Sequence, residues 1–205
     1  MNRSPRLSLL VVVAAAATLA LTGCSKSGSS AASSAPPPPV STSASASGSA
    51  SSSPSMSGGS LVQWAVSATA TTQYGAGAGE SWNASNATGA SVITECQDDG
   101  RAWASQEKNT VDTLTLKYAT PVVPNSITVY ESYNPGYVTS VSVSGGGQNA
   151  VVYTGVPAAK TPCPTTLVIP VSSVKFKVDT VAVTVDQTKL ENWAEIDAVR
   201  LSGTP

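Results

Sequence analysis

The chain of 205 residues contains no histidine, one phenylalanine and two methionines, and only 11% of its residues are charged. Without histidine, a Ser-His-Asp or Cys-His catalytic apparatus and a histidine-ligated zinc site are excluded. The 11 basic residues nearly balance the 12 acidic ones, and they form no cluster of the kind that binds nucleic acid or anionic lipid. We therefore expect no nucleic-acid partner and no histidine-dependent chemistry.

Long apolar runs are also scarce, apart from one near the N-terminus. Two arginines precede residues 7–21, which are rich in Ala, Val and Leu, and two small residues then lead to Cys24. The run is short for a bilayer span, and no charged stop-transfer cluster follows it. The segment Leu21-Thr22-Gly23-Cys24 resembles the lipobox of bacterial lipoproteins. This resemblance implies a signal peptide at residues 1–23 and a lipid on Cys24 that anchors the exported protein to the outer face of the cell membrane.

The chain has only three cysteines, so their pairing options are few. If Cys24 is lipidated, Cys96 and Cys163 remain as an even pair in an exported, oxidising compartment. We predict that these two form a disulfide. The alternative is two free, buried thiols.

Residues 24–60 lack large apolar side chains almost completely and consist mainly of Ser, Ala, Gly and Pro. Such a composition buries too little surface to offset the conformational entropy of the chain. We expect a disordered linker that tethers a single domain, residues 61–205, to the lipid anchor.

From residue 61 onward, the apolar residues alternate with polar ones. Val181, Val183 and Val185 alternate with Thr and Ala, which indicates a strand with one buried face. Val138 and Val141 are three apart, so they can share a face only across a bulge. No stretch has a convincing helical period, and the sequence predicts an all-β sandwich or jelly roll.

Turn-forming residues separate these runs at intervals of about ten residues. The expected turns lie at Pro121 and Pro124, Asn134-Pro135-Gly136, Gly145-Gly146-Gly147 and Pro162-Cys163-Pro164.

Five segments in order resemble the galactose-binding-like jelly roll of discoidin-type domains and carbohydrate-binding modules. They are Ser85-Asn86-Ala87-Thr88-Gly89, residues 98–105 (DDGRAWAS), residues 114–122, residues 127–131 (ITVYE) and residues 193–201 (WAEIDAVRL). The resemblance spans residues 64–202. It implies a β-sandwich whose rim loops bind glycans, lipids or proteins, often beside a structural calcium ion, and it does not identify the ligand.

The loop after Cys96 carries the first candidate ligand-binding residues, Asp98, Asp99 and Arg101, followed by Trp103. Carboxylates and a guanidinium beside an indole can bind a sugar. The alternative is a solvated turn followed by a core tryptophan. In the resembling domains this tryptophan is usually packed inside, which favours a core position for Trp103.

A second candidate surface is the strand end and turn that contains Glu131, Tyr133, Asn134 and Tyr137. If the two tyrosines are exposed, they could form a platform for a glycan. The alternative is an ordinary hairpin turn whose tyrosines shield the edge of the sandwich.

Glu195 and Asp197 are two residues apart in the last expected strand, so we expect them on the same face. A calcium ion could bind these carboxylates, and Asp197 lies where the resembling modules place a calcium-binding acid. The first strand lacks the acidic partner that some of those modules contribute. The alternative is that both acids lie at an exposed rim or pair with arginines.

Together these features predict a lipid-anchored module of the cell envelope that binds a glycan without catalysis. The alternative function is a structural or interaction module that binds an envelope protein through the same loops. We expect no enzymatic activity, because a small sandwich without a deep cleft offers little to raise the pKa of a carboxyl group or to enclose a sugar ring.

Overall fold

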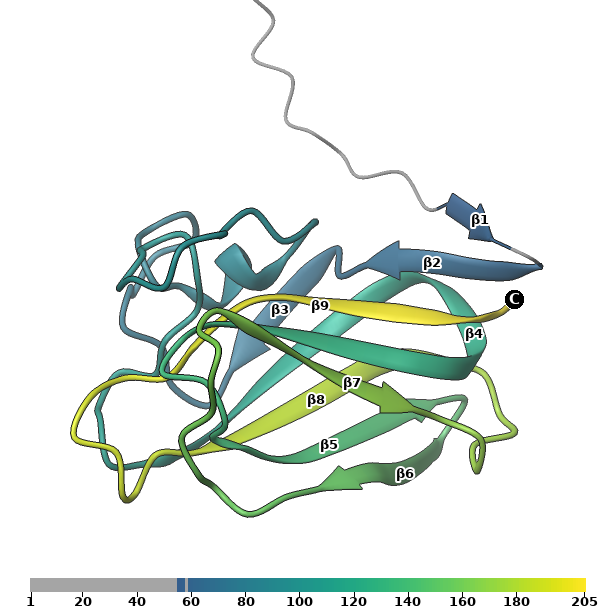
Figure 1. Cartoon of the computed structure of the whole chain (residues 1–205). Helices are drawn as coiled ribbons and strands as arrows, with labels where there is room; N and C mark the ends of the chain where they lie inside the picture. Colours follow the sequence, from purple (N-terminus) through teal and green to yellow (C-terminus); the bar gives the residue numbers. More distant parts are fainter. Residues whose placement is uncertain (1–54, 58) are drawn as a thin grey trace, which may run out of the picture. The chain divides into compact units, whose positions relative to one another are not determined.

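The computed structural model describes residues 55–57 and 59–205, in which strands form where the sequence alternates (Figure 1). The predicted signal peptide, Cys24 and most of the predicted linker lie outside these residues. The strands are β1 Ser55–Ser57, β2 Ser60–Trp64, β3 Ser67–Ala70, β4 Val111–Tyr133, β5 Val138–Gly145, β6 Gln148–Thr154, β7 Thr165–Pro170, β8 Val178–Asp186 and β9 Glu195–Thr204, with a short 3₁₀ helix, η1, at Ala84–Ala87. β-Structure thus begins before residue 61, because β1 pairs with β2.

All strand pairs are antiparallel, and the two layers of the sandwich share the long strand β4. The first half of β4 pairs with β3 and β8, and β5 and β6 continue this layer. The second half of β4 pairs with β7 and β9, and β2 and β1 continue the other layer. The predicted all-β jelly-roll sandwich is confirmed.

The core lies between the two layers and follows the predicted alternation. Val181, Val183 and Val185 of β8 are at most 1% exposed, and they face buried side chains of the other layer such as Val129 and Leu201. Their burial removes apolar surface from water, the dominant driving force for this fold.

The predicted bulge in β5 is present. Val138 and Val141 are both buried, and the pairing of β5 with β8 shifts register between Val138 and Ser140. The shift supplies the extra residue that two positions three apart need to share one face.

The predicted turn at Pro121 and Pro124 is wrong, because β4 continues through both prolines. The register of β4 against β8 shifts between Lys117 and Val122, and its register against β9 shifts next to Pro124. Proline lacks an N–H donor and is tolerated in a strand at such irregular positions. β4 therefore bends from one layer into the other.

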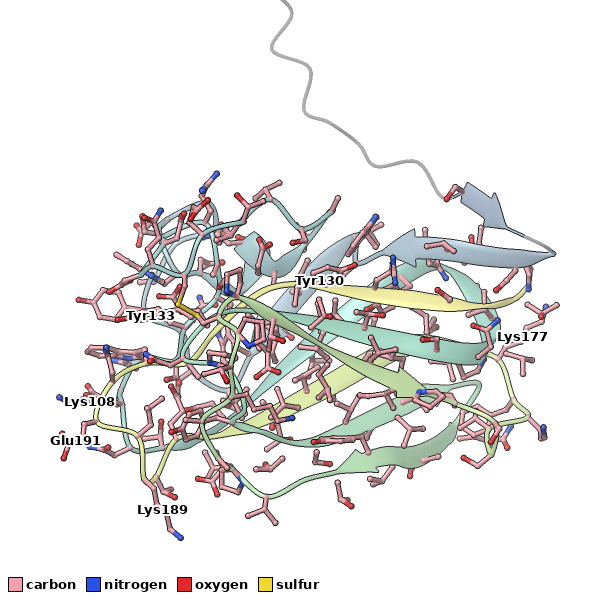
Figure 2. All side chains as sticks on the ribbon, viewed as in Figure 1. Lys108, Tyr130, Tyr133, Lys177, Lys189 and Glu191 are labelled. Carbon is pink, nitrogen blue, oxygen red and sulfur yellow. A yellow bond between two sulfur atoms is a disulfide. The ribbon has the colours of Figure 1, made fainter. Side chains whose placement is uncertain are left out.

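The long connections gather at one end of the sandwich, on the left in Figure 1. The strand pairings place four connections there, residues 71–110, 134–137, 155–164 and 187–194. We call this end the loop end. In Figure 2, Lys108, Tyr133 and Glu191 lie at this end and Lys177 lies at the other.

A disulfide joins Cys96 to Cys163 across two of these connections, as the cysteine count predicts. It closes a loop of 67 residues, and in the chain-entropy model such a crosslink stabilises the fold by about 4 kcal/mol. The bond holds the long loop before β4 against the loop before β7.

Within the described part of the chain, no helix is long and apolar enough to cross a membrane.

Candidate functional site

Three aromatic side chains surround a small pocket at the loop end, which we call the aromatic pocket. Its volume is about 90 Å³, and its lining residues are Tyr74, Trp82, Asp98, Ala104, Trp193 and Glu195. They come from three separate parts of the chain: the loop between β3 and β4, the loop between β8 and β9, and the start of β9. The jelly-roll topology is what brings them together.

The loop before β4 is held in place by its own backbone and polar side chains. The backbone N–H of Trp82 donates to the Gly100 carbonyl at 2.9 Å, and the Asn83 side chain donates to the Gly75 carbonyl at 2.8 Å. The backbone of Trp82 has a positive φ of 57°, which few non-glycine residues adopt outside special sites. These hydrogen bonds hold the indole of Trp82 in the pocket wall.

The three rings of the pocket pack edge to face. The Tyr74 ring centroid lies 5.3 Å from that of Trp82 and 5.9 Å from that of Trp193, in the geometry that aromatic quadrupoles favour. The Tyr74 side chain is nevertheless 54% exposed. A large aromatic ring is thus presented to solvent at the mouth of the pocket.

A pair of carboxyl groups completes the lining. Glu195 is only 1% exposed, and its two oxygens accept hydrogen bonds from Trp82 Nε1 at 3.0 Å and from the Asp99 N–H at 3.2 Å. Burial and the hydrogen bond with Asp98 raise the pKa of Glu195 to about 8. At neutral pH the Glu195 carboxyl is therefore mostly protonated.

Few basic groups lie near this pair. Lys108 lies over the Trp193 ring, 6.0 Å from its centroid, and donates to the Glu191 carbonyl. Arg101 forms an ion pair with Asp99 at 2.6 Å. The hydrogen bond from Arg101 lowers the pKa of Asp99 to about 2, so these two charges largely neutralise each other.

The sequence of residues 53–205 matches the family model described as Pappalysin-1, SD scarf domain, C-terminal. The chain belongs to this family. No curated protein matches this SD scarf domain chain.

Solved carbohydrate-binding modules are similar to this SD scarf domain in structure. CpGH89CBM32-4 of Clostridium perfringens, in complex with GlcNAc-α-1,4-galactose, is 12% identical with a TM-score of 0.50, over 67% of this chain and 89% of that one. The family 32 module of C. perfringens NanJ, in complex with galactose, is 15% identical with a TM-score of 0.49, over 69% and 98%. Chitosan-binding module 1 from the chitosanase/glucanase of Paenibacillus sp. IK-5 is 18% identical with a TM-score of 0.48, over 66% and 92%. The similarity is one of fold, and the predicted resemblance to these modules is confirmed.

Of the first group of predicted residues in this SD scarf domain, only Asp98 lines the aromatic pocket. Asp99 and Arg101 pair with each other and line a different, shallow hollow beside Asn86. Trp103 is 0% exposed, and its indole donates to the Thr72 carbonyl at 3.1 Å. The core position that the resemblance favours is confirmed for Trp103.

The second predicted surface is not an aromatic platform. Tyr137 is only 8% exposed, so the expectation that both tyrosines are exposed is wrong for this residue, which packs in the core. Glu131 is buried as well, and its carboxylate accepts a hydrogen bond from the Gly136 N–H at 2.6 Å. Its role is to hold the turn after β4, although burial raises its pKa.

The other two residues of that group, Tyr133 and Asn134, contact the segment that carries Trp193, which lines the aromatic pocket. The Asn134 side chain donates to the Trp193 carbonyl at 2.7 Å, and the Asn192 side chain donates to the Tyr133 hydroxyl at 3.2 Å. Tyr133 and Asn134 therefore position the segment that carries Trp193.

Glu195 and Asp197 are both buried but do not form one site. Glu195 lines the aromatic pocket, whereas Asp197 Oδ2 accepts hydrogen bonds from Ser91 Oγ, Val92 N and Ile93 N at 2.5, 2.9 and 3.1 Å. A cation would have to displace these N–H and O–H donors, which occupy both oxygens of Glu195 and Oδ2 of Asp197. Among the described residues, no three acidic or cysteine side chains gather to hold a metal ion. As held here, the two acids do not fit a shared calcium site, and calcium elsewhere stays a prediction.

Sequence reasoning missed Tyr74, Trp82 and Trp193 as site residues. A signal was present for two of them, because Tyr74 and Trp82 lie in a segment rich in Gly, Ala, Ser and Asn without strand alternation, whereas Trp193 follows a short polar segment directly before the last strand. Large aromatic residues in loops are candidates for binding, although Trp103 of the same loop packs in the core.

Proposed function

We propose that this domain binds a glycan at the aromatic pocket and does not change it chemically. The observation that carries the proposal is the convergence of Tyr74, Trp82 and Trp193 around two carboxyl groups at the loop end. An aromatic face packs against the C–H face of a pyranose, and carboxyl oxygens accept hydrogen bonds from sugar hydroxyls. The glycan complex of CpGH89CBM32-4, which has the same fold, supports glycans as the ligand class.

The geometry of the acids argues for binding without turnover. Glycosidases place two carboxyl groups on either side of the scissile bond, about 5 to 9.5 Å apart. Asp98 and Glu195 instead hydrogen-bond to each other, so no glycosidic bond fits between them. The pocket is also far smaller than the ~300 Å³ at which ligand-enclosing sites begin. We expect no release of reducing sugar from any glycan that the protein retains.

We also propose that a lipid on Cys24 anchors the domain to the outer face of the cell membrane. The lipobox-like segment before Cys24 supports this, and the Ser/Pro-rich stretch after it gives the domain reach. Metabolic labelling with a tagged fatty acid should mark the wild-type chain, and Cys24→Ala should abolish both the label and recovery in the membrane fraction. An unlabelled wild-type chain contradicts the anchor.

The binding proposal is tested by co-sedimentation of the purified full chain with a panel of insoluble cell-wall and plant polysaccharides. Trp193→Ala should weaken retention at least tenfold, since a tryptophan at the centre of a binding site typically contributes 2 kcal/mol or more. Tyr74→Ala serves as a second variant, and it should fold like the wild type because the Tyr74 side chain is 54% exposed. Trp64→Ala is the matched control, because Trp64 lies in β2 and packs against Tyr130, away from the pocket.

Three results contradict the proposal. The first is that no polysaccharide retains the wild-type chain. The second is that Trp64→Ala abolishes retention while Trp193→Ala leaves it intact. The third is that crosslinking on cells captures an envelope protein through the loop end while no glycan binds, which favours the alternative interaction module.

A further inference from the structure

The lining of the aromatic pocket is acidic and aromatic, with no basic residue in it. The guanidinium of Arg101, three residues after Asp98, is engaged by Asp99. Lys108 lies over the Trp193 ring and donates to a backbone carbonyl, and it is not part of the lining. A pocket of this composition favours a group that carries positive charge.

The carboxyl groups of Glu195 and Asp98 differ in how many further hydrogen bonds they can accept from a ligand. Both oxygens of Glu195 receive N–H donors from the protein. Asp98 is exposed, and its carboxylate contacts Glu195 but receives no backbone or side-chain N–H in the part of the chain that the structure describes. Asp98 therefore has acceptor capacity for a donor on a ligand.

Size limits what enters the pocket. A volume of about 90 Å³ holds about six to nine water molecules at roughly 10 to 15 Å³ each by the same measure. The pocket thus admits one substituent of a sugar, while the ring of that sugar packs outside against the exposed face of Tyr74.

Building on the proposed glycan binding, we propose that the substituent is the protonated primary amine of an amino sugar. A primary ammonium donates hydrogen bonds to Asp98 and is attracted by the faces of Trp82 and Trp193. A quaternary ammonium has no N–H for a carboxylate to accept. An N-acetyl group adds bulk and removes the charge.

The test is isothermal titration calorimetry of the full chain with a glucosamine tetrasaccharide and with its fully N-acetylated counterpart. At pH 6 most of the amines are protonated, because an amine beside electron-withdrawing groups, such as an α-amino group, has a pKa of about 8. We expect the free amine to bind at least tenfold more tightly than the acetylated sugar. Asp98→Asn should erase that preference, since a hydrogen bond to a charged group is typically worth tenfold or more in affinity.

Asp99→Asn is the matched control, because it removes the same charge from the next residue, outside the pocket lining. It should leave the preference for the amine intact. Choline is titrated as a third ligand, because its quaternary ammonium has no N–H to donate to Asp98. It should bind more weakly than the glucosamine tetrasaccharide. Asp98→Asn should show the wild-type urea midpoint within error, because Asp98 is exposed. Asp99→Asn loses the ion pair with Arg101, so its binding is measured where its urea unfolding curve shows that it is folded.

The outcomes separate this inference from the proposed function. If both sugars bind equally, or if Asp98→Asn and Asp99→Asn weaken the amine to the same extent, the amine inference is overturned while glycan binding stands. Stronger binding of choline than of the amino sugar also overturns it. If neither sugar binds and the polysaccharide panel is negative as well, the proposed function fails and the inference fails with it.

Discussion

The buried carboxyl of Glu195 makes a direct prediction about the pH dependence of stability. Its pKa in the folded protein is raised to about 8, first by burial and then by the hydrogen bond with Asp98, against an unperturbed value of 4.5. Between these two values the folded state binds more protons than the unfolded state, so the free energy of unfolding falls as pH rises. The stabilisation from the protonated group is fully present below pH 4.5 and is lost by the time the pH passes 8.

The magnitude follows from the size of the shift. Each pH unit inside the window costs at most about 1.4 kcal/mol, and integration from pH 5 to pH 8 gives a loss of at most about 3.5 kcal/mol from this group. Glu195→Gln removes the titration. It also removes one acceptor, since glutamine has a single carbonyl oxygen for the two donors, Trp82 Nε1 and Asp99 N–H, which costs about 1 kcal/mol.

Urea unfolding followed by tryptophan fluorescence, for wild type and Glu195→Gln from pH 5 to pH 8, measures the effect. The difference between the two proteins cancels the titration of distant groups. We expect the variant to be less stable at pH 5, and the two curves to converge or cross before pH 8. Curves that stay parallel across this range would show that Glu195 ionises normally and refute the reasoning.

Two further predictions concern the loop end and its support. Replacement of Cys96 and Cys163 by alanine should lower the free energy of unfolding by about 4 kcal/mol, measured by urea unfolding, and a loss below 1 kcal/mol contradicts the chain-entropy account. Gly136→Ala should lower Tm strongly, because φ is 104° there and a Cβ would lie 2.1 Å from the Ala158 carbonyl oxygen. Gly146→Ala is the control, because φ is 56° there and no atom lies within 4 Å of the new Cβ. It should lower the free energy of unfolding only by the backbone cost of about 1 to 2 kcal/mol. If both variants lower Tm equally, the steric explanation for Gly136 is excluded.

The strands were predictable because their burial repeats every two residues. The alternation in β8 and the bulge between Val138 and Val141 both follow from which side chains must face the core. The path of β4 was not predictable in the same way. Pro121 and Pro124 are usual signs of a turn. The two halves of β4 form one strand only because the first half pairs with β8 and the second half pairs with β9.

The site was less predictable than the fold, because its residues meet only through long-range topology. Asp98 was found from its acidic loop, but Trp82 and Trp193 are 111 residues apart in the sequence, and nothing local relates them. Tyr137 shows the opposite problem. It follows a Pro-Gly turn that is typical of the surface, yet its carbonyl accepts a hydrogen bond from the Asp186 N–H at 2.9 Å at the end of β8, and its side chain is buried in the core.

The central claim, that the aromatic pocket binds a glycan, is tested most directly by the indole N–H signals of the four tryptophans in two-dimensional ¹H–¹⁵N NMR of the labelled full chain. A glycan retained in the polysaccharide panel, added as a soluble oligosaccharide, should shift the signals of Trp82 and Trp193, which line the pocket. The signals of Trp103 in the core and Trp64 in β2 should stay in place. A titration that moves Trp64 alone, or moves none of the four, contradicts the account.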